Sequence, residues 1–196
     1  IMRKSTIKKI SLTAAILGLT VGGTSVLLNQ VNASTGAPAT TKTTQENKVT
    51  GINLSQSDAI NKFNEKYGSK AIEEIELEAK KDKYVYEIKG FDSQNEYEVK
   101  IDASNGNILK SDTEKLDSDY KNEQLDLNNI IDREQATQIA QQSVQGQPVK
   151  WTLEKDDGQT IWEIEFENGD KETEVKIDAN SQKVLKTEVD DDRDDD

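Results

Sequence analysis

The sequence contains no cysteine and no histidine. Without cysteine the chain forms no disulfide, and no thiol is available as a nucleophile or a metal ligand. Without histidine it lacks the most common general base, the base of catalytic triads and the most common zinc ligand. Carboxylates, lysine, serine and tyrosine remain available for chemistry. These absences argue against an enzyme, and the sequence predicts no catalytic, cofactor-binding or metal-binding residue.

The charge of the chain is strongly one-sided. Its 196 residues include 25 basic and 38 acidic side chains, a formal net charge of −13. Such a surface repels phosphate backbones, so we expect no nucleic-acid partner. Cationic partners and divalent cations are compatible with it, and so is the simpler interpretation that the charge keeps the protein soluble.

Residues 1–33 have the pattern of a targeting segment. Four basic residues precede an apolar stretch from Ile10 to Leu28, and Val31 and Ala33 suit a cleavage site before Ser34. An uncleaved membrane anchor is the alternative, because this stretch approaches the ~20 residues needed to cross a bilayer. In both cases we expect the rest of the chain to be secreted or at the cell surface, with no lipid anchor on cysteine. Residues 34–51, rich in threonine and alanine, are expected to form a flexible linker.

A six-residue string, Glu-Val-Lys-Ile-Asp-Ala, occurs at 98–103 and again at 174–179, 76 positions later. The same offset relates the flanking residues, which are Tyr86-Glu87-Ile88 with Trp162-Glu163-Ile164, and Ile108-Leu109-Lys110 with Val184-Leu185-Lys186. The chain therefore contains two tandem copies of one unit.

The repeat sets the predicted domain boundaries. The first unit covers residues 52–113 and the second covers 127–190. A polar, acidic linker at 114–126 joins them, and an acidic tail at 191–196 follows.

Each unit begins with a predicted helix. In the first, Ser55 is the N-cap and Gly68 ends the helix. In the second, Asp132 is the N-cap with Gln135 as its capping-box partner, and we expect the helix to end at Gly146.

Alternating apolar residues then predict four strands in each unit. The predicted strands are 72–78, 84–90, 97–103 and 108–111 in the first unit, and 149–154, 160–167, 173–179 and 184–187 in the second. Asn105-Gly106, Asp157-Gly158 and Asn168-Gly169 are turn signals between them. We expect an α+β fold of two tandem units, each with one helix packed on a small antiparallel sheet of about four strands.

These residues resemble the PepSY domain, which occurs in the propeptides of thermolysin-like metalloproteases and in many small secreted or membrane-associated bacterial proteins. The motif reads Tyr/Trp-Glu-Ile, then Val-Lys-Ile-Asp-Ala, then Ile/Val-Leu-Lys, and it is present in both units. The second unit departs from it in one place, where Gln182 replaces the turn glycine, Gly106, of the first. We expect this change to loosen the turn.

The resemblance implies a non-catalytic domain that binds or inhibits proteases, or regulates peptidase activity near the cell envelope. A His-Glu-x-x-His motif is impossible without histidine, so the units are not a propeptide joined to such an enzyme. We therefore expect a protein that acts in trans, as a monomer, on a protein partner such as a secreted or membrane-associated peptidase. The alternative is an acidic envelope protein that is structural or buffers divalent cations such as Ca²⁺.

Four sets of residues are candidates for a site, and each also has a structural explanation. Asp102 and Asp178 are expected to cap turns rather than bind a ligand. Trp151 and Trp162 alternate with other apolar residues, which predicts core positions rather than an aromatic platform.

The remaining candidates are carboxylates. Glu163 and Glu165 are expected on the exposed face of a strand, where a glycosidase pair is improbable. Asp190–Asp196 lacks the spacing of a calcium loop and is expected to be a solvated tail.

Overall fold

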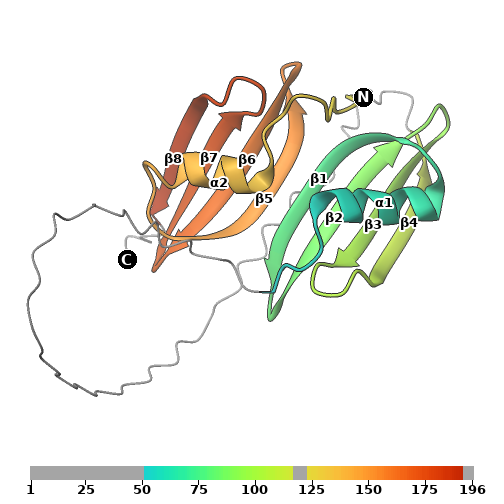
Figure 1. Cartoon of the computed structure of the whole chain (residues 1–196), viewed down its shortest axis with the longest axis horizontal. Helices are drawn as coiled ribbons and strands as arrows, with labels where there is room; N and C mark the ends of the chain where they lie inside the picture. Colours follow the sequence, from blue (N-terminus) through green and yellow to red (C-terminus); the bar gives the residue numbers. More distant parts are fainter. Residues whose placement is uncertain (1–50, 117–122, 192–196) are drawn as a thin grey trace, which may run out of the picture. The chain divides into compact units, whose positions relative to one another are not determined.

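A computed structural model gives the structure, and it describes residues 51–116 and 123–191. The predicted targeting segment, most of the linker 34–51, residues 117–122 and the tail beyond Asp191 lie outside the described residues. The described elements, in chain order (Figure 1), are α1 (Gln56–Tyr67), β1 (Ala71–Lys80), β2 (Lys83–Phe91), β3 (Asn95–Asp102), β4 (Ile108–Lys115), α2 (Arg133–Ala140), β5 (Gln147–Asp156), β6 (Gln159–Asn168), β7 (Lys171–Asp178) and β8 (Val184–Asp191). We refer to α1 and β1–β4 as repeat 1, and to α2 and β5–β8 as repeat 2.

Both helices start where the sequence predicts. Ser55 accepts a hydrogen bond from the backbone N–H of Asp58 at 3.1 Å, which satisfies one free donor of the first turn of α1. Asp132 and Gln135 form the predicted capping box, with bonds of 2.7 and 3.1 Å in the two directions. Neither described helix is long and apolar enough to cross a membrane.

The end of α2 differs from the prediction. The helix stops at Ala140, six residues before Gly146. The chain continues in tighter turns, in which Gln142 and Ser143 donate to carbonyls three residues earlier, at 3.2 and 3.1 Å. Gly146 serves another purpose: its φ is +136°, and a Cβ there would lie 2.6 Å from the carbonyl oxygen of Glu167. A side chain at this position would clash with the backbone of β6, which explains why the residue is glycine.

The eight strands form one antiparallel sheet in the order β4-β3-β2-β1-β5-β6-β7-β8. The sequence predicts two separate small sheets, but β1 pairs with β5 and joins them. We call this junction the seam. Its register pairs Ile75 to Glu78 with Leu153 to Lys150, so Glu76 lies opposite Thr152, the equivalent position 76 residues later.

The last strand of each repeat is longer than predicted. β4 reaches Lys115 and β8 reaches Asp191, whereas the sequence pattern ends at 111 and 187. Alternating polar residues such as those from Asp112 to Lys115 look like a linker in sequence. Pairing with β3 nevertheless orders their backbone, because Glu96 lies opposite Glu114 and Asn95 opposite Lys115.

The hairpin turns follow the sequence signals with one shift. Asp157 and Gly158 are the two central residues of the β5–β6 turn, with φ of 49° and 81°, as the Asp-Gly pair predicts. At the β6–β7 turn Asn168 still pairs with Lys171, so the central residues are Gly169 and Asp170 rather than Asn168 and Gly169.

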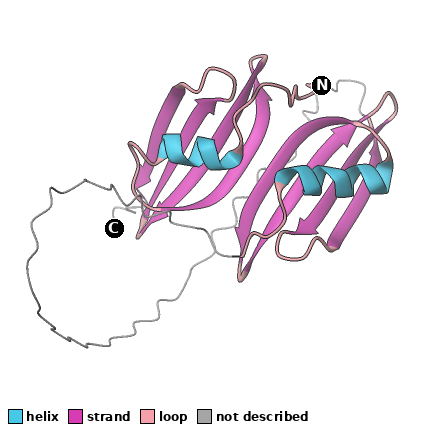
Figure 2. Ribbon diagram, in the orientation of Figure 1, coloured by secondary structure: helices cyan, strands magenta, loops and turns pink. Residues whose placement is uncertain are grey.

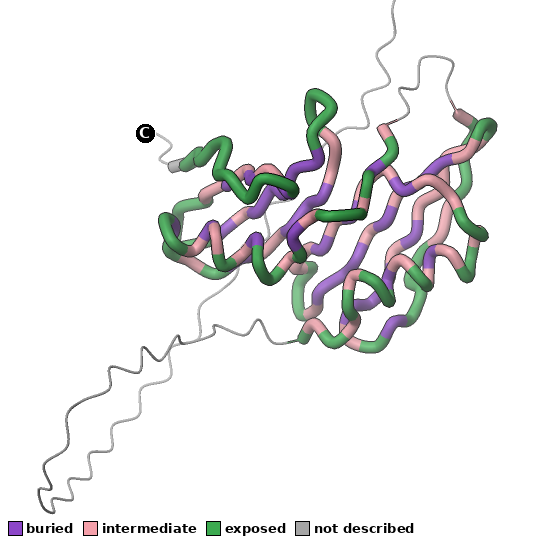
Figure 3. Tube along the Cα trace, turned by 45° about the horizontal axis from the view of Figure 1, so that its top comes forward, coloured by how far each residue is buried: buried purple, intermediate pink, exposed green. Residues whose placement is uncertain are grey.

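The core lies between the helices and one face of the sheet. Each helix runs across the strands of its own repeat (Figure 2), α1 contacting β2 and β3 and α2 contacting β6 and β7. In the seam register, the core residues Ile75 and Leu77 lie opposite Leu153 and Trp151. Residues opposite each other share a face, so both helices cover the same face of the sheet. Buried and less buried positions accordingly alternate along the strands (Figure 3).

The part of the predicted linker nearest repeat 2 belongs to this core. Leu125 is 4% exposed, and its N–H donates to the carbonyl of Ile72 in β1 at 2.8 Å. The connection between the repeats is thus fixed to the sheet before α2 begins.

Candidate functional site

Charged side chains gather on the face of the sheet opposite the helices, which we call the outer face. On β1, Glu74, Glu76 and Glu78 alternate with the core residues Ile75 and Leu77. Side chains two apart on a strand share a face, and so do side chains opposite each other on neighbouring strands. The pairing register therefore places every residue of this face.

One line of residues crosses all eight strands at the middle of the outer face. The registers of the seven strand pairs connect, from one edge to the other, Lys110, Lys100, Glu87, Glu76, Thr152, Glu163, Lys176 and Lys186. We call these eight residues the central row. Each member of one half is related to its counterpart by 76 positions, so the row is symmetric about the seam except that threonine faces glutamate at its centre.

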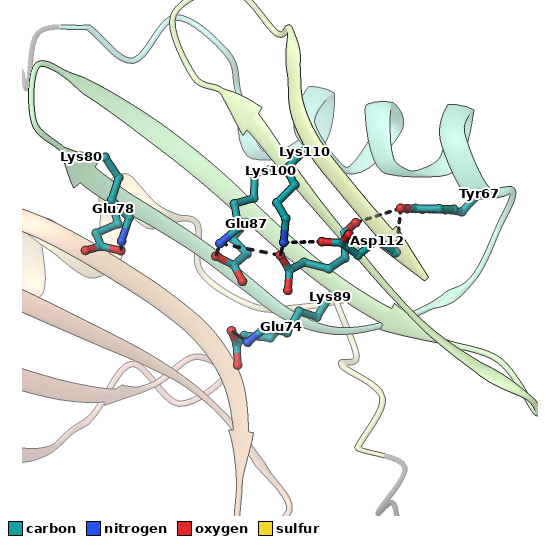
Figure 4. A network of polar contacts seen from close by, with 10 residues as sticks. Tyr67, Glu74, Glu78, Lys80, Glu87, Lys89, Lys100, Lys110 and Asp112 are labelled. Carbon is teal, nitrogen blue, oxygen red and sulfur yellow. Dashed lines mark hydrogen bonds and ion pairs between the residues drawn. The ribbon is translucent and has the colours of Figure 1, made fainter. Parts of the chain in front are cut away.

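The same ion-pair arrangement occurs in both halves of the row. Lys100 Nζ lies 2.5 Å from Glu87 Oε2 and 3.7 Å from Glu98 Oε1 in repeat 1. The neighbouring Lys110 reaches Asp112 at 2.5 Å and Glu98 at 4.0 Å, and these groups form one connected network (Figure 4). In repeat 1, Lys100 therefore lies between two glutamates, and the equivalent lysine of repeat 2 has the same surroundings.

In repeat 2, Lys176 Nζ lies 2.7 Å from Glu163 Oε2 and 3.6 Å from Glu174 Oε1. Burial, followed by the negative charge of Glu163, raises the pKa of Glu174. The bond to Glu163 in turn raises the pKa of Lys176.

At the seam, one lysine, Lys150, is shared by two glutamates that lie on different strands. Lys150 Nζ lies 2.9 Å from Glu165 Oε1 and 3.6 Å from Glu76 Oε2. Burial raises the pKa of Glu76 to about 7, against the opposing effect of Lys150. Burial works against the charge of Lys150, but Glu165 and Glu76 together hold its pKa above the ordinary value. Glu76 is therefore a carboxyl that can exchange a proton near neutral pH.

Glu163 is not on an exposed surface, which corrects the prediction. It is 7% exposed, because it lies on a central strand where the long side chains of neighbouring strands cover it. Its partner is Lys176 and that of Glu165 is Lys150, so each of the two carboxylates binds a different lysine. The pair belongs to the ion-pair lattice of the outer face.

Asp102 and Asp178 cap turns, as predicted. Asp102 Oδ1 accepts from the N–H and the hydroxyl of Ser104, at 3.0 and 2.5 Å. Asp178 Oδ1 accepts from the N–H groups of Asn180 and Ser181, at 3.0 and 2.6 Å. Hydrogen bonds from Ser104 and Ser181, respectively, lower the pKa of the two carboxyls. Both aspartates fix the strand-to-turn junction that follows the repeated six-residue string.

Trp151 and Trp162 are core residues, as predicted, with 2% and 1% exposure. Both place the indole N–H toward α2 and its approach, where Trp151 Nε1 donates to Thr137 at 2.8 Å and Trp162 Nε1 donates to the carbonyl of Ile131 at 3.0 Å. They attach the helix to the sheet.

Most of the acidic tail lies outside the residues that the structure describes. Asp190 and Asp191 pair with Glu172 and Lys171 as part of β8, and residues 192–196 lie outside the described range. Among the residues that the structure describes, no group of three or more potential ligands is arranged to hold a metal ion.

The central position of Glu76 was not predicted from the sequence. The sequence does show that Glu74, Glu76 and Glu78 alternate with apolar residues, which indicates a strand with one polar face. The seam register is not visible, because it depends on which strands meet when the two repeats fold together.

Comparisons with known proteins agree with the duplicated unit. The family model described as "Peptidase propeptide and YPEB domain" (PepSY) matches twice, over residues 53–112 and 130–188, together more than half of the chain. The "Uncharacterized protein YkoJ" of Bacillus subtilis (strain 168) is 29% identical over 121 residues, which are 61% of this chain and 66% of that protein, just under two thirds of its length. A crystal structure described as that of a "putative lipoprotein" from Clostridium difficile 630 has a TM-score of 0.67 and 38% identity, and the match covers 71% of this chain and 95% of that one.

Proposed function

Because this chain belongs to the PepSY family, with one copy of the domain in each repeat, we propose that it is a non-catalytic protein that acts outside the cytoplasm by binding a protein partner. The partner in this proposal is a peptidase, which the protein inhibits or regulates in trans. The observation that carries the proposal is the tandem match to a domain described by its presence in peptidase propeptides, in a sequence without histidine. The location is supported by the "putative lipoprotein" description of the Clostridium difficile relative and by the targeting pattern of residues 1–33.

The outer face is the proposed contact surface. Both described helices pack on the opposite face, so neither of them covers the outer face of the eight-stranded sheet. Its charged groups are ordered by ion pairs such as Lys100–Glu87 and Lys176–Glu163, which lowers the entropy lost when a partner binds. Its acidic character favours a partner surface that carries lysine and arginine.

Inhibition assays test the proposal. Purified residues 34–196 are added to a metallopeptidase of the thermolysin type, a serine peptidase of the subtilisin type and a cysteine peptidase of the papain type, with casein as substrate. We expect saturable inhibition of at least one of them with an inhibition constant of about 1 μM or below. Gel electrophoresis must show the protein intact, because a competing substrate is degraded while an inhibitor is not.

A matched pair of variants locates the surface. Glu188→Arg changes an exposed carboxylate of the outer face, and Glu65→Arg makes the same change on α1, on the side of the sheet that carries the helices. Weaker inhibition by the first variant alone supports the outer face. No inhibition of any of the three peptidases by the intact protein contradicts the proposal.

A further inference from the structure

The seam is the narrowest junction in the sheet. Only four residue pairs form it, from Ile75–Leu153 to Glu78–Lys150, whereas nine pairs join β5 to β6. On the side of the sheet that carries the helices, Arg133 Nη1 of repeat 2 donates to the Tyr86 hydroxyl of repeat 1 at 3.4 Å. The rings of Tyr84 and Trp151 also meet across this junction, with centroids 5.9 Å apart, and the Lys150–Glu76 ion pair crosses it on the outer face. Because the ladder of the seam is short, a local change there affects the coupling of the repeats.

The carboxyl of Glu76 lies in the middle of this junction. It faces Glu87 on β2 and Thr152 on β5 in the central row. On the outer face, these four strands carry the following charged and polar side chains: Glu74, Glu78 and Lys80 on β1; Lys83, Glu87 and Lys89 on β2; Lys150, Thr152, Glu154 and Asp156 on β5; and Gln159, Glu163, Glu165 and Glu167 on β6. Carboxylates outnumber lysines in this set.

The lysines of this region are already engaged. Lys80 pairs with Glu78, and Lys83 pairs with Asp102. Lys89 bonds to Glu74 at 2.8 Å, and Lys100 bonds to Glu87 at 2.5 Å. Lys150 lies closer to Glu165, at 2.9 Å, than to Glu76, at 3.6 Å. A negative charge on Glu76 is therefore only weakly compensated, while a neutral carboxyl in the same place avoids repulsion from Glu87, Glu78 and Glu74.

We propose that the seam is a proton-linked hinge, in which a protonated Glu76 closes the β1–β5 junction and its deprotonation loosens it. The two repeats then form one continuous outer face in mildly acidic surroundings and move more independently in alkaline ones. The threonine opposite Glu76 is part of the device, because a second glutamate there would place two carboxylates against each other across the seam. The hinge does not rest on the proposed function and applies to any partner of the outer face.

The direction of the effect follows from the pKa of Glu76. Burial raises it to about 7 in the closed state, from an ordinary value of 4.5 that applies once the seam opens to solvent. Below the ordinary value both states are protonated and the pH has no effect. Between pH 4.5 and about 7 the open state has lost its proton while the closed state keeps it, so the closed state becomes less stable relative to the open state as the pH rises. Above pH about 7 both states are deprotonated, and their relative stability no longer changes.

Residue-resolved hydrogen exchange of the full chain tests the hinge. The observable is the protection of amides bonded across the seam, in Ile75–Glu78 and Lys150–Leu153, relative to amides of the β2–β3 ladder and corrected for intrinsic rates. Between pH about 5.5 and about 8.5 we expect this ratio to fall at least about tenfold, the change that one unit of pKa produces. Glu76→Gln, which is neutral at all pH values and keeps the shape, is expected to hold the ratio constant.

Two further variants complete the test. Glu98→Gln, on the outer face but away from the seam, should retain the pH dependence of the unchanged protein. Thr152→Glu should steepen it, with its strongest effect at alkaline pH. The hinge is disproved if the seam ratio of the unchanged protein does not vary with pH, or if Glu76→Gln varies as much as the unchanged protein does.

Discussion

The turn after β7 contains a left-handed residue that is not glycine. Gln182 has φ of +65°, and its N–H donates to the carbonyl of Asp178 at 2.9 Å. The equivalent turn in repeat 1 has Gly106 with φ of +75° and the same bond, to Asp102, at 2.8 Å. The expected loosening of the second turn is therefore wrong, because the hydrogen bonds hold the left-handed conformation even with a side chain present.

Gln182→Gly should stabilise the protein. An L-residue in the left-handed region costs about 1–2 kcal/mol, and the greater chain entropy of glycine in the unfolded state cancels part of the gain. We expect a net increase of about 0.5–1 kcal/mol in the free energy of unfolding, measured by urea denaturation.

Gln138→Gly is the matched control. Gln138 is exposed in the middle of α2, where glycine should lower the free energy of unfolding by about 1 kcal/mol. A loss of stability in both variants would show that the left-handed turn carries no strain.

In each repeat a phenylalanine ring packs between the helix and the sheet, but it comes from the helix in repeat 1 and from a strand in repeat 2. In repeat 1, Phe63 of α1 lies against Gly90 of β2, and a Cβ on Gly90 would lie 2.7 Å from Phe63 Cζ. The two helices are related by 77 positions, counted from the N-caps Ser55 and Asp132, and the strands by 76. In repeat 2 the equivalent helix residue is therefore Ala140 and the equivalent strand residue is Phe166, both fully buried. One phenyl ring thus packs between helix and sheet in each repeat, from the helix in one and from the strand in the other.

This exchange predicts a coupled pair of substitutions. Phe63→Ala alone should cost about 3–5 kcal/mol through the cavity it leaves. Gly90→Phe alone should also destabilise the protein, because the ring and the carbonyl oxygen of Ala71 already occupy the space. In the double variant the new ring enters the cavity, but the Ala71 carbonyl oxygen, 2.5 Å from the new Cβ, must still shift. We therefore expect Gly90→Phe to destabilise the Phe63→Ala background by about 1–3 kcal/mol less than it destabilises the unchanged protein.

A double-mutant cycle of urea denaturation curves measures this coupling. If Gly90→Phe destabilises the Phe63→Ala background as much as the unchanged protein, the two positions do not share one space.

In the molecule as a whole, cooperativity depends on the seam and on Arg133. This residue starts α2, lies over the ring of Trp151 with its guanidinium carbon 5.4 Å from the centroid, and contacts Tyr86 of repeat 1. Together with the contact between the rings of Tyr84 and Trp151, whose centroids lie 5.9 Å apart, it connects the helix side of both repeats.

Arg133→Ala should uncouple the unfolding of the two repeats. Both tryptophans of the chain, Trp151 and Trp162, lie in repeat 2, so their fluorescence follows that repeat alone while circular dichroism follows both. We expect coincident urea transitions by the two probes in the unchanged protein and separate transitions in the variant.

Arg133→Lys, which keeps the positive charge over the indole ring, should separate the transitions less. Coincident transitions in Arg133→Ala would mean that the ladder of the seam is sufficient to couple the repeats.

The sequence alone determined the repeat, the family resemblance, both helix starts and the position of most strands. These depend on local patterns: Ser55 and Asp132 cap their own helices, and Val99, Ile101, Val175 and Ile177 alternate within their own strands. The roles of Asp102 and Asp178 were predictable for the same reason, because each bonds to residues two or three positions away.

The tertiary structure decided what connects the repeats. The β1–β5 register, the burial of Glu163, the partial burial of Glu76 and the filling of one space by Phe63 or Phe166 all depend on residues far apart in the chain. Strand alternation states which side chains share a face, but any edge strand can in principle pair with any other, so it cannot choose the neighbour. The central row, and the position of the Glu76 carboxyl at its middle, exist only because β1 pairs with β5 in this register.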